Sequence, residues 1–581
     1  TKQATVTDID GNFTIQEVNP NASINISYVG MQAVTLKASG NLNVTLKDDF
    51  QNLNDVVVIG YGSAKAKDLT SPITVVKAAD IQSVPSASPM TALQGKVAGV
   101  NVVSSGAPGS APTVRIRGAG SFKNSSPLYV VDGMFYDDIT FLNNDDIQDF
   151  TILKDASAAA IYGVRAANGV VLITTKKGTK NQKAQITYDG YVGFQKASNV
   201  LELCNAKEYA TMMLEGNYDA YVSHFKKSID NYGGSYSDPD FHNWTYNTDN
   251  DWYDQMLRTA LITNHSLSIA GGSDKTTYSL GGSYLYQDGI MDVDNNYKRL
   301  NFRAAVDYNA TNWLKVGFNG VFSQSEQQVP NNAAWQKAFN CPPIVALYDK
   351  NNDKAFPNKY GSPDVLGYSS NFYNPIAFAE YYDSKNESYQ ALTNFYAQID
   401  FIPNKLNLRS NYSYSFLSTQ GREFTPAYYV SSWQQSTTTK LKKSENKYYN
   451  RIWDNTLTYN DQFGKHKVGA MVGMSMREEQ WRNLNGSASN VPDGEDEYWY
   501  IKNGDATGAT VGDDGYCYRG LSYFTRLNYN YDDKYMLVFT MRADGSSKYQ
   551  EKWGYFPSIG GAWVISQENF LKDQKWLDML K

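Results

Sequence analysis

The side chains best able to carry out nucleophilic or metal chemistry are few in this 581-residue sequence, and they lie far apart. They are His224, His242, His265, His466, Cys204, Cys341 and Cys517. The cysteines form no CxxC pair, and the sequence holds no HExxH, GxSxG or phosphate-binding loop. We therefore expect no metal, no cofactor and no catalytic activity.

A short β-branched run is the clearest candidate for a binding segment. It consists of Asp55, Val56, Val57, Val58, Ile59, Gly60, Tyr61 and Gly62. Polar residues precede it, and a stretch rich in Gly, Ser and Lys follows it. A strand isolated in this way can add to the edge of another protein's sheet, where backbone hydrogen bonds supply the grip. An ordinary internal strand fits the same pattern equally well.

Five polar or flexible residues in the N-terminal third indicate structural roles. Arg115 and Arg117 alternate on one predicted strand, so both should lie on one face. There they contact substrate or, as we expect, pair with carboxylates of a surrounding wall. Asp132 precedes a glycine and indicates a tight turn. Asp155 caps a short Ala-rich helix, and Gly163 ends it.

Four tryptophans lie in long polar segments and are candidates for contact with a ligand or a partner. They are Trp252, Trp335, Trp433 and Trp499. An indole ring can stack on a sugar, pack on a partner protein or lie at a membrane surface. The sequence leaves these alternatives open.

Composition excludes several classes of protein. The 53 Lys and Arg against 59 Asp and Glu give a net charge of −6, which does not suit a nucleic-acid-binding face. No apolar run reaches the roughly 18 residues that a helical membrane span needs. The sequence opens at Thr1 without a signal peptide, which fits a cytosolic or an already processed chain. Aromatic content is high, with 44 Tyr, 25 Phe and 11 Trp.

Two small units are predicted before residue 181. Residues 1–48 alternate apolar and polar side chains and indicate a small β-domain. Residues 70–180 indicate a compact α+β unit, which includes a predicted helix at Met90–Val97 and a strand at Thr113–Arg117. The linker 49–69 holds the β-branched run.

From about residue 184 onward, segments of ten to twelve residues alternate strictly between apolar and polar. In one of them Val468, Val472 and Met476 share a face opposite Lys467 and Ser475. A period of two predicts strands with one apolar and one polar face. Short and long connections also alternate, which is typical of an up-and-down antiparallel sheet with tight turns at one rim and large loops at the other.

The predicted strand lengths indicate that the apolar faces contact membrane lipid. Nine to eleven tilted residues cross a bilayer, and a closed barrel leaves no backbone group unsatisfied in lipid. A soluble protein with many short strands is the alternative. We count about twelve strands, whereas plugged barrels have about 22. We therefore expect the sequence to end within the barrel.

Several motifs resemble those of the SusC-like (SusC/RagA) TonB-dependent outer-membrane transporters of Bacteroidetes. They are Leu93–Val100 (LQGKVAGV), Val114–Gly118 (VRIRG), Pro127–Gly133 (PLYVVDG), Ile152–Gly163 (ILKDASAAAIYG), Arg165–Gly178 (RAANGVVLITTKKG) and Phe556–Trp563 (FPSIGGAW). This sequence departs from the motif at Val164, where members of the family usually have a small polar residue.

The resemblance implies an assignment for each region. Residues 1–48 would be an incomplete carboxypeptidase-regulatory-like domain, Asp55–Gly62 the TonB box, 70–180 the plug, and 181–581 the first part of a 22-stranded barrel. TonB, with ExbB and ExbD, would then drive oligosaccharide import across the outer membrane. A SusD-like lipoprotein would act as lid, and such pairs can form dimers. The N-terminal domain of residues 1–48 and the TonB box would lie in the periplasm.

Three other functions remain open from the sequence. Peptides could replace oligosaccharides as the substrate of the same mechanism. A siderophore or cobalamin importer is a related alternative, and a secreted β-rich glycan-binding or adhesive protein is an alternative of another class.

Overall fold

The structure is a computed structural model of the chain. It describes residues 5, 7, 12–15, 19, 22–26, 34–45, 56–58, 63–65, 70, 73–82, 84–120, 125–236, 244–571 and 579–581. The chain forms two compact units, Thr1–Leu69 and Thr70–Lys581. Within the described ranges, no helix combines the length and the apolar character that a membrane crossing demands.

The first unit contains two small antiparallel hairpins. In one, β1 (Ser23–Ile26) pairs with β2 (Val34–Lys37). In the other, β3 (Val56–Val58) pairs with β4 (Ser63–Lys65), and Val57 lies opposite Ala64. Asp55 and residues 59–62 of the predicted binding segment lie outside the described residues.

A small α+β unit opens the second compact unit. Its central sheet has the order β5-β10-β11-β8-β9, in which β11 and β8 are parallel and the other pairs are antiparallel. The strands are β5 (Ile73–Lys77), β8 (Leu128–Val131), β9 (Met134–Tyr136), β10 (Ile147–Leu153) and β11 (Val170–Thr175), with a separate hairpin of β6 (Val100–Val103) and β7 (Thr113–Ile116). The apolar runs of β8 and β11 are almost fully buried, which explains why these strands read as continuous rather than alternating.

Helices in this unit are short. They are α1 (Ala78–Gln82), η2 (Thr91–Leu93), η3 (Asn144–Asp146), α2 (Ala156–Ala159) and η4 (Ala160–Ala166). The predicted helix at Met90–Val97 is wrong, because only η2 forms there. Gly95 and Gly99 take φ values of +74° and +78°, which end any helical run.

The remainder of the chain is built on one large antiparallel sheet. Its strands are β12 (Gln185–Gln195), β15 (Ala260–Gly272), β16 (Thr276–Asp288), β17 (Asn296–Asn309), β18 (Leu314–Gln328), β19 (Asp383–Ile402), β20 (Leu406–Thr425), β23 (Lys440–Phe463), β24 (His466–Ser489), β25 (Thr510–Tyr531), β26 (Tyr535–Ser546) and β27 (Trp553–Trp563). These 12 strands pair in chain order, as predicted. The sheet is open, with β12 and β27 at its edges.

Connections segregate to two rims, which confirms the sequence pattern. Short turns join β15 to β16, β17 to β18, β19 to β20, β23 to β24 and β25 to β26. The opposite rim carries the long insertions, which are residues 196–259, 329–382, 426–439 and 490–509. The strands are longer than predicted, since β23 and β24 each have 24 residues. The alternation marks only the part of each strand that has one apolar face, and the strands continue beyond it with polar residues on both faces.

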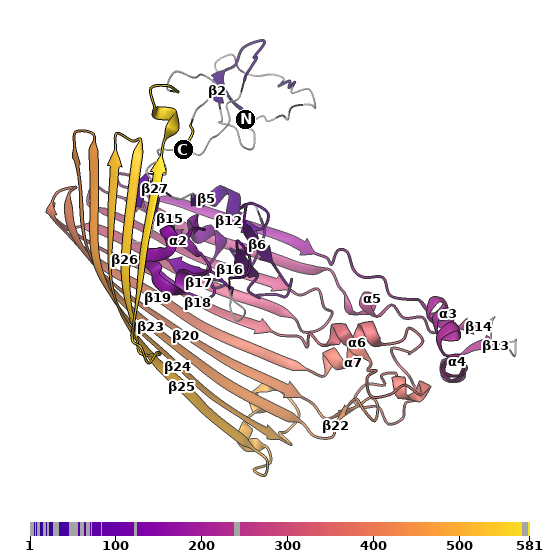
Figure 1. The fold of residues 1–581 in the computed structure, drawn as a ribbon. Helices are drawn as coiled ribbons and strands as arrows, with labels where there is room; N and C mark the ends of the chain where they lie inside the picture. Colours follow the sequence, from indigo (N-terminus) through magenta and orange to yellow (C-terminus); the bar gives the residue numbers. More distant parts are fainter. Residues whose placement is uncertain are drawn as a thin grey trace. The chain divides into compact units, whose positions relative to one another are not determined.

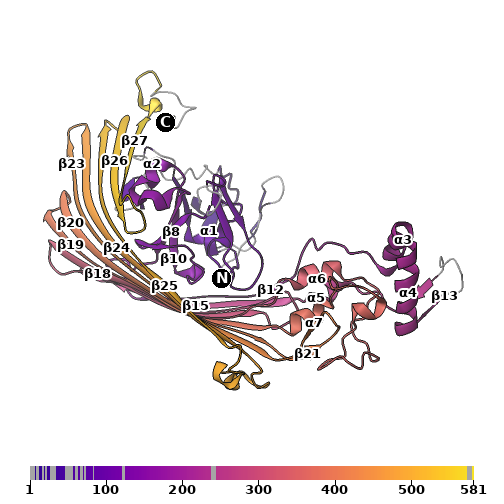
Figure 2. The same ribbon diagram turned by 60° about the horizontal axis from the view of Figure 1, so that its bottom comes forward.

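Burial on this sheet is the reverse of that in a water-soluble protein. Val472 points outward and is 52% exposed, whereas Ser475 of the same strand is buried on the inner face. Arg299, Asn301 and Arg303 of β17 are likewise buried on the inner side. An apolar exterior and a polar interior are typical of a barrel that faces lipid. The plug-like unit of residues 70–180 packs in the concave side of the curved sheet (Figure 2).

The long insertions carry helices with a core of their own (Figure 1). These elements are α3 (Ala206–Gly216), α4 (Tyr218–Tyr232), β13 (Gly234–Tyr236), β14 (Trp244–Tyr246), α5 (Trp252–Met256), α6 (Ala334–Asn340), η5 (Pro363–Leu366) and α7 (Pro375–Glu380). Phe225, Trp252, Cys341 and Leu366 are buried together at their centre. The remaining short elements are two strands and three 3-10 helices. The strands are β21 (Tyr428–Tyr429) and β22 (Gln435–Ser436), and the 3-10 helices are η6 (Asp496–Tyr498), η7 (Ile501–Asn503) and η8 (Ile565–Gln567).

Candidate functional site: a cavity between the plug and the sheet

A cavity of about 820 Å³ lies between the plug-like unit and the inner face of β20 and β23–β27. Its size suits an oligomeric small ligand. The lining from the plug side is Phe135, Tyr136, Asp137, Asp138, Tyr162 and Arg165. The turn between β26 and β27, at the rim of the long connections, closes one side with Lys548 and Tyr549.

The β8–β9 turn positions the plug side of the cavity. Asp132 and the following glycine take φ values of +47° and +95°, so a two-residue turn forms as predicted. The Asp132 carboxylate accepts hydrogen bonds from Thr175 Oγ1, at 2.7 Å, and from the Asn319 amide of β18. Asn394 Nδ2 donates to the Asp132 carbonyl at 2.8 Å. The turn is therefore tied to the sheet, and β9 presents Phe135 to the cavity.

Register aligns aromatic residues on the wall. Tyr448 of β23 lies opposite Trp481 of β24, which lies opposite Tyr516 of β25. The successive ring centroids are 6.2 Å and 5.6 Å apart. Glu479 and Tyr518 form part of the next inward row toward the plug. Such a row of rings offers flat apolar surface beside polar groups, as ligand sites commonly do.

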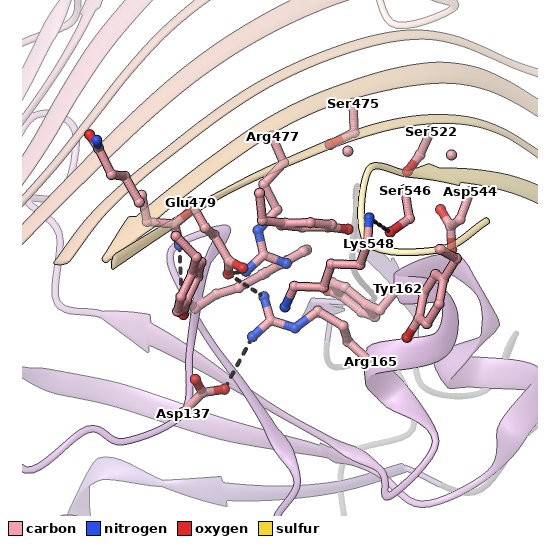
Figure 3. A pocket seen from close by; sticks show the side chains of 18 of the residues that line it. Asp137, Tyr162, Arg165, Ser475, Arg477, Glu479, Ser522, Asp544, Ser546 and Lys548 are labelled. Atoms are coloured by element: carbon pink, nitrogen blue, oxygen red, sulfur yellow. Dashed lines mark hydrogen bonds and ion pairs between the residues drawn. The ribbon is translucent and has the colours of Figure 1, made fainter. Parts of the chain in front are cut away.

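Charged groups in the cavity are paired with one another. Arg165 donates to Asp137 at 3.1 Å and to Glu479 at 3.3 Å, so it bridges plug and sheet. Glu479 also pairs with Arg477. Figure 3 shows Arg165, Arg477 and Lys548 converging on the same space. Because cations and carboxylates are matched, the cavity suits a neutral polar or a zwitterionic ligand better than a strongly charged one.

Aromatic rings hold two of these cations. The Arg477 guanidinium lies 5.6 Å from the ring centroid of Phe135, and Lys548 Nζ lies 4.7 Å from that of Tyr518. Both distances fall within the range of cation–π attraction. Burial raises the pKa of Tyr162 far above its ordinary value, so its hydroxyl stays protonated at neutral pH.

The predicted role of Arg117 is wrong. Arg117 pairs with Asp155 inside the plug rather than with the wall. It lies just beyond the end of β7 with φ +56°, so strand alternation no longer sets the direction of its side chain. Arg115 is exposed. Asp155 occupies the N-cap position of α2 as predicted, but it makes no capping hydrogen bond from its side chain, since its carboxylate binds Arg117.

Gly163 lies at a close approach of the plug to β26. It interrupts η4 with φ +69° and ψ −155°, a conformation that side chains rarely allow. A Cβ atom there would lie 2.1 Å from Asp544 Oδ2 and 2.9 Å from Arg542 Nε. The glycine therefore breaks the helical run at the predicted position, although η4 resumes and ends at Ala166. Its lack of a side chain also leaves room for Asp544 and Arg542 of β26.

Two of the four predicted contact tryptophans are structural instead. Trp252 is 1% exposed and donates from Nε1 to the Pro342 carbonyl at 3.1 Å. Trp499 stacks on Phe424 with centroids 3.7 Å apart. Trp335 packs partly buried against the helical core. Trp433 is 56% exposed, and its contact with a ligand or partner stays a prediction.

Sequence reasoning missed most residues of the cavity. Arg165, Arg477, Glu479, Tyr518 and Lys548 come from the plug and from three separate strands or turns. No local pattern marks them, because cross-strand register brings them together. Among the residues that the structure describes, no cluster of His, Cys, Asp or Glu is arranged to hold a metal ion.

Comparison with known proteins agrees with this architecture. Residues 65–170 match the model of the TonB-dependent receptor plug domain. The chain is 32% identical to TonB-dependent receptor SusC of Bacteroides thetaiotaomicron and to TonB-dependent receptor P3 of Formosa agariphila. Both matches cover 100% of this chain, and they cover 58% and 56% of those proteins.

A solved structure of the RagAB peptide importer in an open-open state resembles this fold with a TM-score of 0.74. That match has 25% identity and covers 89% of this chain and 59% of the other. The chain thus spans a little over half the length of the relatives it matches. With its plug domain and its likeness to SusC along the whole sequence, the chain belongs to the SusC-like TonB-dependent receptors.

Proposed function

We propose that the protein takes part in TonB-dependent import of oligosaccharides across the outer membrane, working with a SusD-like lipoprotein. One observation carries this proposal above the others. The 820 Å³ cavity lies on the long-connection side of the plug, and rings from several strands line it. Aromatic faces pack against sugar rings, and the amides of Asn446 and Asn483, which are 2.9 Å apart in the next row, could bind sugar hydroxyls.

Peptide import is the second candidate. Paired charges such as Arg165 with Glu479 suit a zwitterionic chain, and the similar RagAB structure is of a peptide importer. Calorimetric titration of glycan and peptide panels into the receptor with its lipoprotein partner distinguishes the two. We expect glycan binding that Tyr518→Ala weakens about tenfold. Trp313→Ala removes an exposed ring from the short turn between β17 and β18 and should leave binding unchanged. Binding of peptides alone would favour the second candidate, and binding of neither would overturn both.

Energy coupling would act through Asp55–Gly62 as TonB box, with ExbB and ExbD supplying the force. The backbone of Val56–Val58 is extended, as β-augmentation by TonB requires. Deletion of residues 56–60 should abolish uptake and leave ligand binding intact. A deletion of residues 505–509, an exposed loop segment that lies outside the cavity, serves as a length control. Normal uptake by the first deletion would refute this role.

A further inference from the structure

The outward face of β23–β25 changes character abruptly along the strands. The outward rows across the three strands are mostly apolar from the row of Phe463 and His466 up to the row of Trp453, Met476 and Leu521. The polar side chains between these rows are Asp461, near the short-turn end, and Asn455 and Thr525. The ten residue-to-residue steps from His466 to Met476, at roughly 3.3 Å each and tilted by about 40°, give a height of about 25 Å. That is the height of the lipid-facing band of an outer-membrane barrel.

Basic residues begin in the very next row. Arg451, Glu478 and Arg519 lie opposite one another on the three strands. Arg451 Nη1 lies 2.5 Å from Glu478 Oε1, and Arg519 Nε lies 2.8 Å from Glu478 Oε2. One carboxylate therefore serves two guanidinium groups. The Arg519 side chain is 74% exposed, so most of its donors face outward.

Two more cations follow on the same face. Lys447 and Arg482 lie opposite each other two rows farther from the apolar band. We call Lys447, Arg451, Arg482 and Arg519 the outward basic patch. Glu478 lies within it, while Glu445 and Asp513 lie in the row beyond. The patch therefore has an excess of positive charge at the level where lipid headgroups begin.

A second cavity, of about 430 Å³, opens beyond the patch on this outward face. Charged residues of both signs line it. The cations are Lys385, Arg422 and Lys443, and the carboxylates are Glu387, Glu445 and Asp496. Residues 496–503 cover it from the face opposite the plug, where Ile501 packs over the strands (Figure 2). Most of the lining surface is nevertheless apolar, with Leu484, Ile501 and Val511 contributing, so the hollow suits the carbon faces of sugar rings with charged groups at their edges. It adjoins the patch through the 2.8 Å ion pair of Lys447 with Glu445.

We propose that the outward basic patch binds the phosphorylated headgroup of a glycolipid in the outer leaflet. The phosphates pair with Arg451, Arg519, Arg482 and Lys447, and the sugars extend into the 430 Å³ cavity. Guanidinium groups bind phosphate through paired, charge-assisted hydrogen bonds, which suits a site at a wet interface. The proposal rests on the outer-membrane orientation of the proposed function and does not depend on the imported substrate.

Lipid binding to the detergent-solubilised chain tests the proposal. The probes are a lipid A with its phosphates and the same lipid A after enzymatic removal of the phosphates, and native mass spectrometry measures the bound fraction. We expect the phosphorylated form to bind about tenfold more tightly. The triple variant Arg451→Gln/Arg482→Gln/Arg519→Gln should lose that preference, while Arg519→Gln alone should lower the affinity about fivefold.

The matched control is Lys405→Gln/Lys465→Gln/Lys467→Gln. These three lysines pair with Asp461, Asp532 and Asp533 at the short-turn rim, so the same charge is removed at the other membrane surface. The control should keep wild-type lipid binding. Equal binding of both lipids by the wild type, or wild-type binding by both patch variants, overturns the proposal. Substrate titration of the patch variants, whose inner cavity is intact, distinguishes its failure from failure of the import function.

Discussion

Arg303 of the sheet and Asp146 of the plug form an ion pair that is sealed from solvent. Arg303 Nε lies 2.9 Å from Asp146 Oδ1, and the side chains are 1% and 7% exposed. Arg303 also donates to the Lys176 carbonyl and, at 2.9 Å, to Ser279 Oγ. One arginine of β17 therefore holds η3 and the end of β11 against the wall.

Arg303→Met should loosen the plug. The substitution leaves the Asp146 carboxylate buried without its partner, which costs about 3–5 kcal/mol. Amide hydrogen exchange in residues 140–176 should then accelerate by about a hundredfold or more. The double variant Arg303→Met/Asp146→Asn should recover most of the protection, since no buried charge is left unpaired. Unchanged exchange in the single variant would show that the pair does not anchor the plug.

Gly163→Ala should displace the plug from β26. The new Cβ would lie 2.1 Å from Asp544 Oδ2, and the backbone conformation itself disfavours alanine by about 1–3 kcal/mol. Gly95→Ala is the matched control, because its φ is +74° but no atom lies within 4 Å. We expect the first variant to lower the thermal unfolding midpoint of the solubilised protein more than the second. Equal midpoints would mean that backbone strain alone matters at Gly163.

Trp252→Ala should destabilise the helical insertions. Loss of this buried ring costs about 3–5 kcal/mol and leaves the Pro342 carbonyl without its indole donor. Limited proteolysis should then cut residues 196–259 and 329–382 many times faster than in the wild type. Trp433→Ala removes an exposed ring of the same type and should leave the cutting rate unchanged. Resistance of the Trp252 variant would contradict the assigned core.

Cys341 should respond to alkaline pH in a defined direction. Burial raises the pKa of its thiol well above the usual value, so it stays protonated when folded. In the unfolded chain the thiol ionises above about pH 8.5, so the stability that it contributes is present below that pH and is lost as pH rises above it. A maleimide at pH 7 should label the exposed Cys204 and Cys517 in the native protein and Cys341 only after denaturation.

Cys341→Ser provides the comparison for pH. A serine does not ionise in this range, so the difference in stability between the variants should shrink as pH rises from 8 to 10. A difference that stays constant over this range would contradict the assigned burial of the thiol.

Alternation was enough to predict the twelve strands, the apolar outward face and the two kinds of rim. A strand's two faces follow from the direction of each Cβ, which is a local property, as at Val472 and Ser475. The Asp132 turn is local for the same reason, because its glycine neighbour permits the left-handed conformation. The helix at Met90–Val97 fails as a prediction because residue preferences in that window were outweighed by the conformations of Gly95 and Gly99.

The sequence by itself thus determined which segments pair and which side of each faces lipid. Only the tertiary structure decided that Arg117 meets Asp155, that Arg165 meets Glu479, and that Arg451 and Arg519 share Glu478. These contacts depend on register between strands and on how the plug seats against the wall. Strand register and plug position bring together residues that can be hundreds of positions apart in the sequence. The periodicity of a single segment therefore cannot predict these contacts.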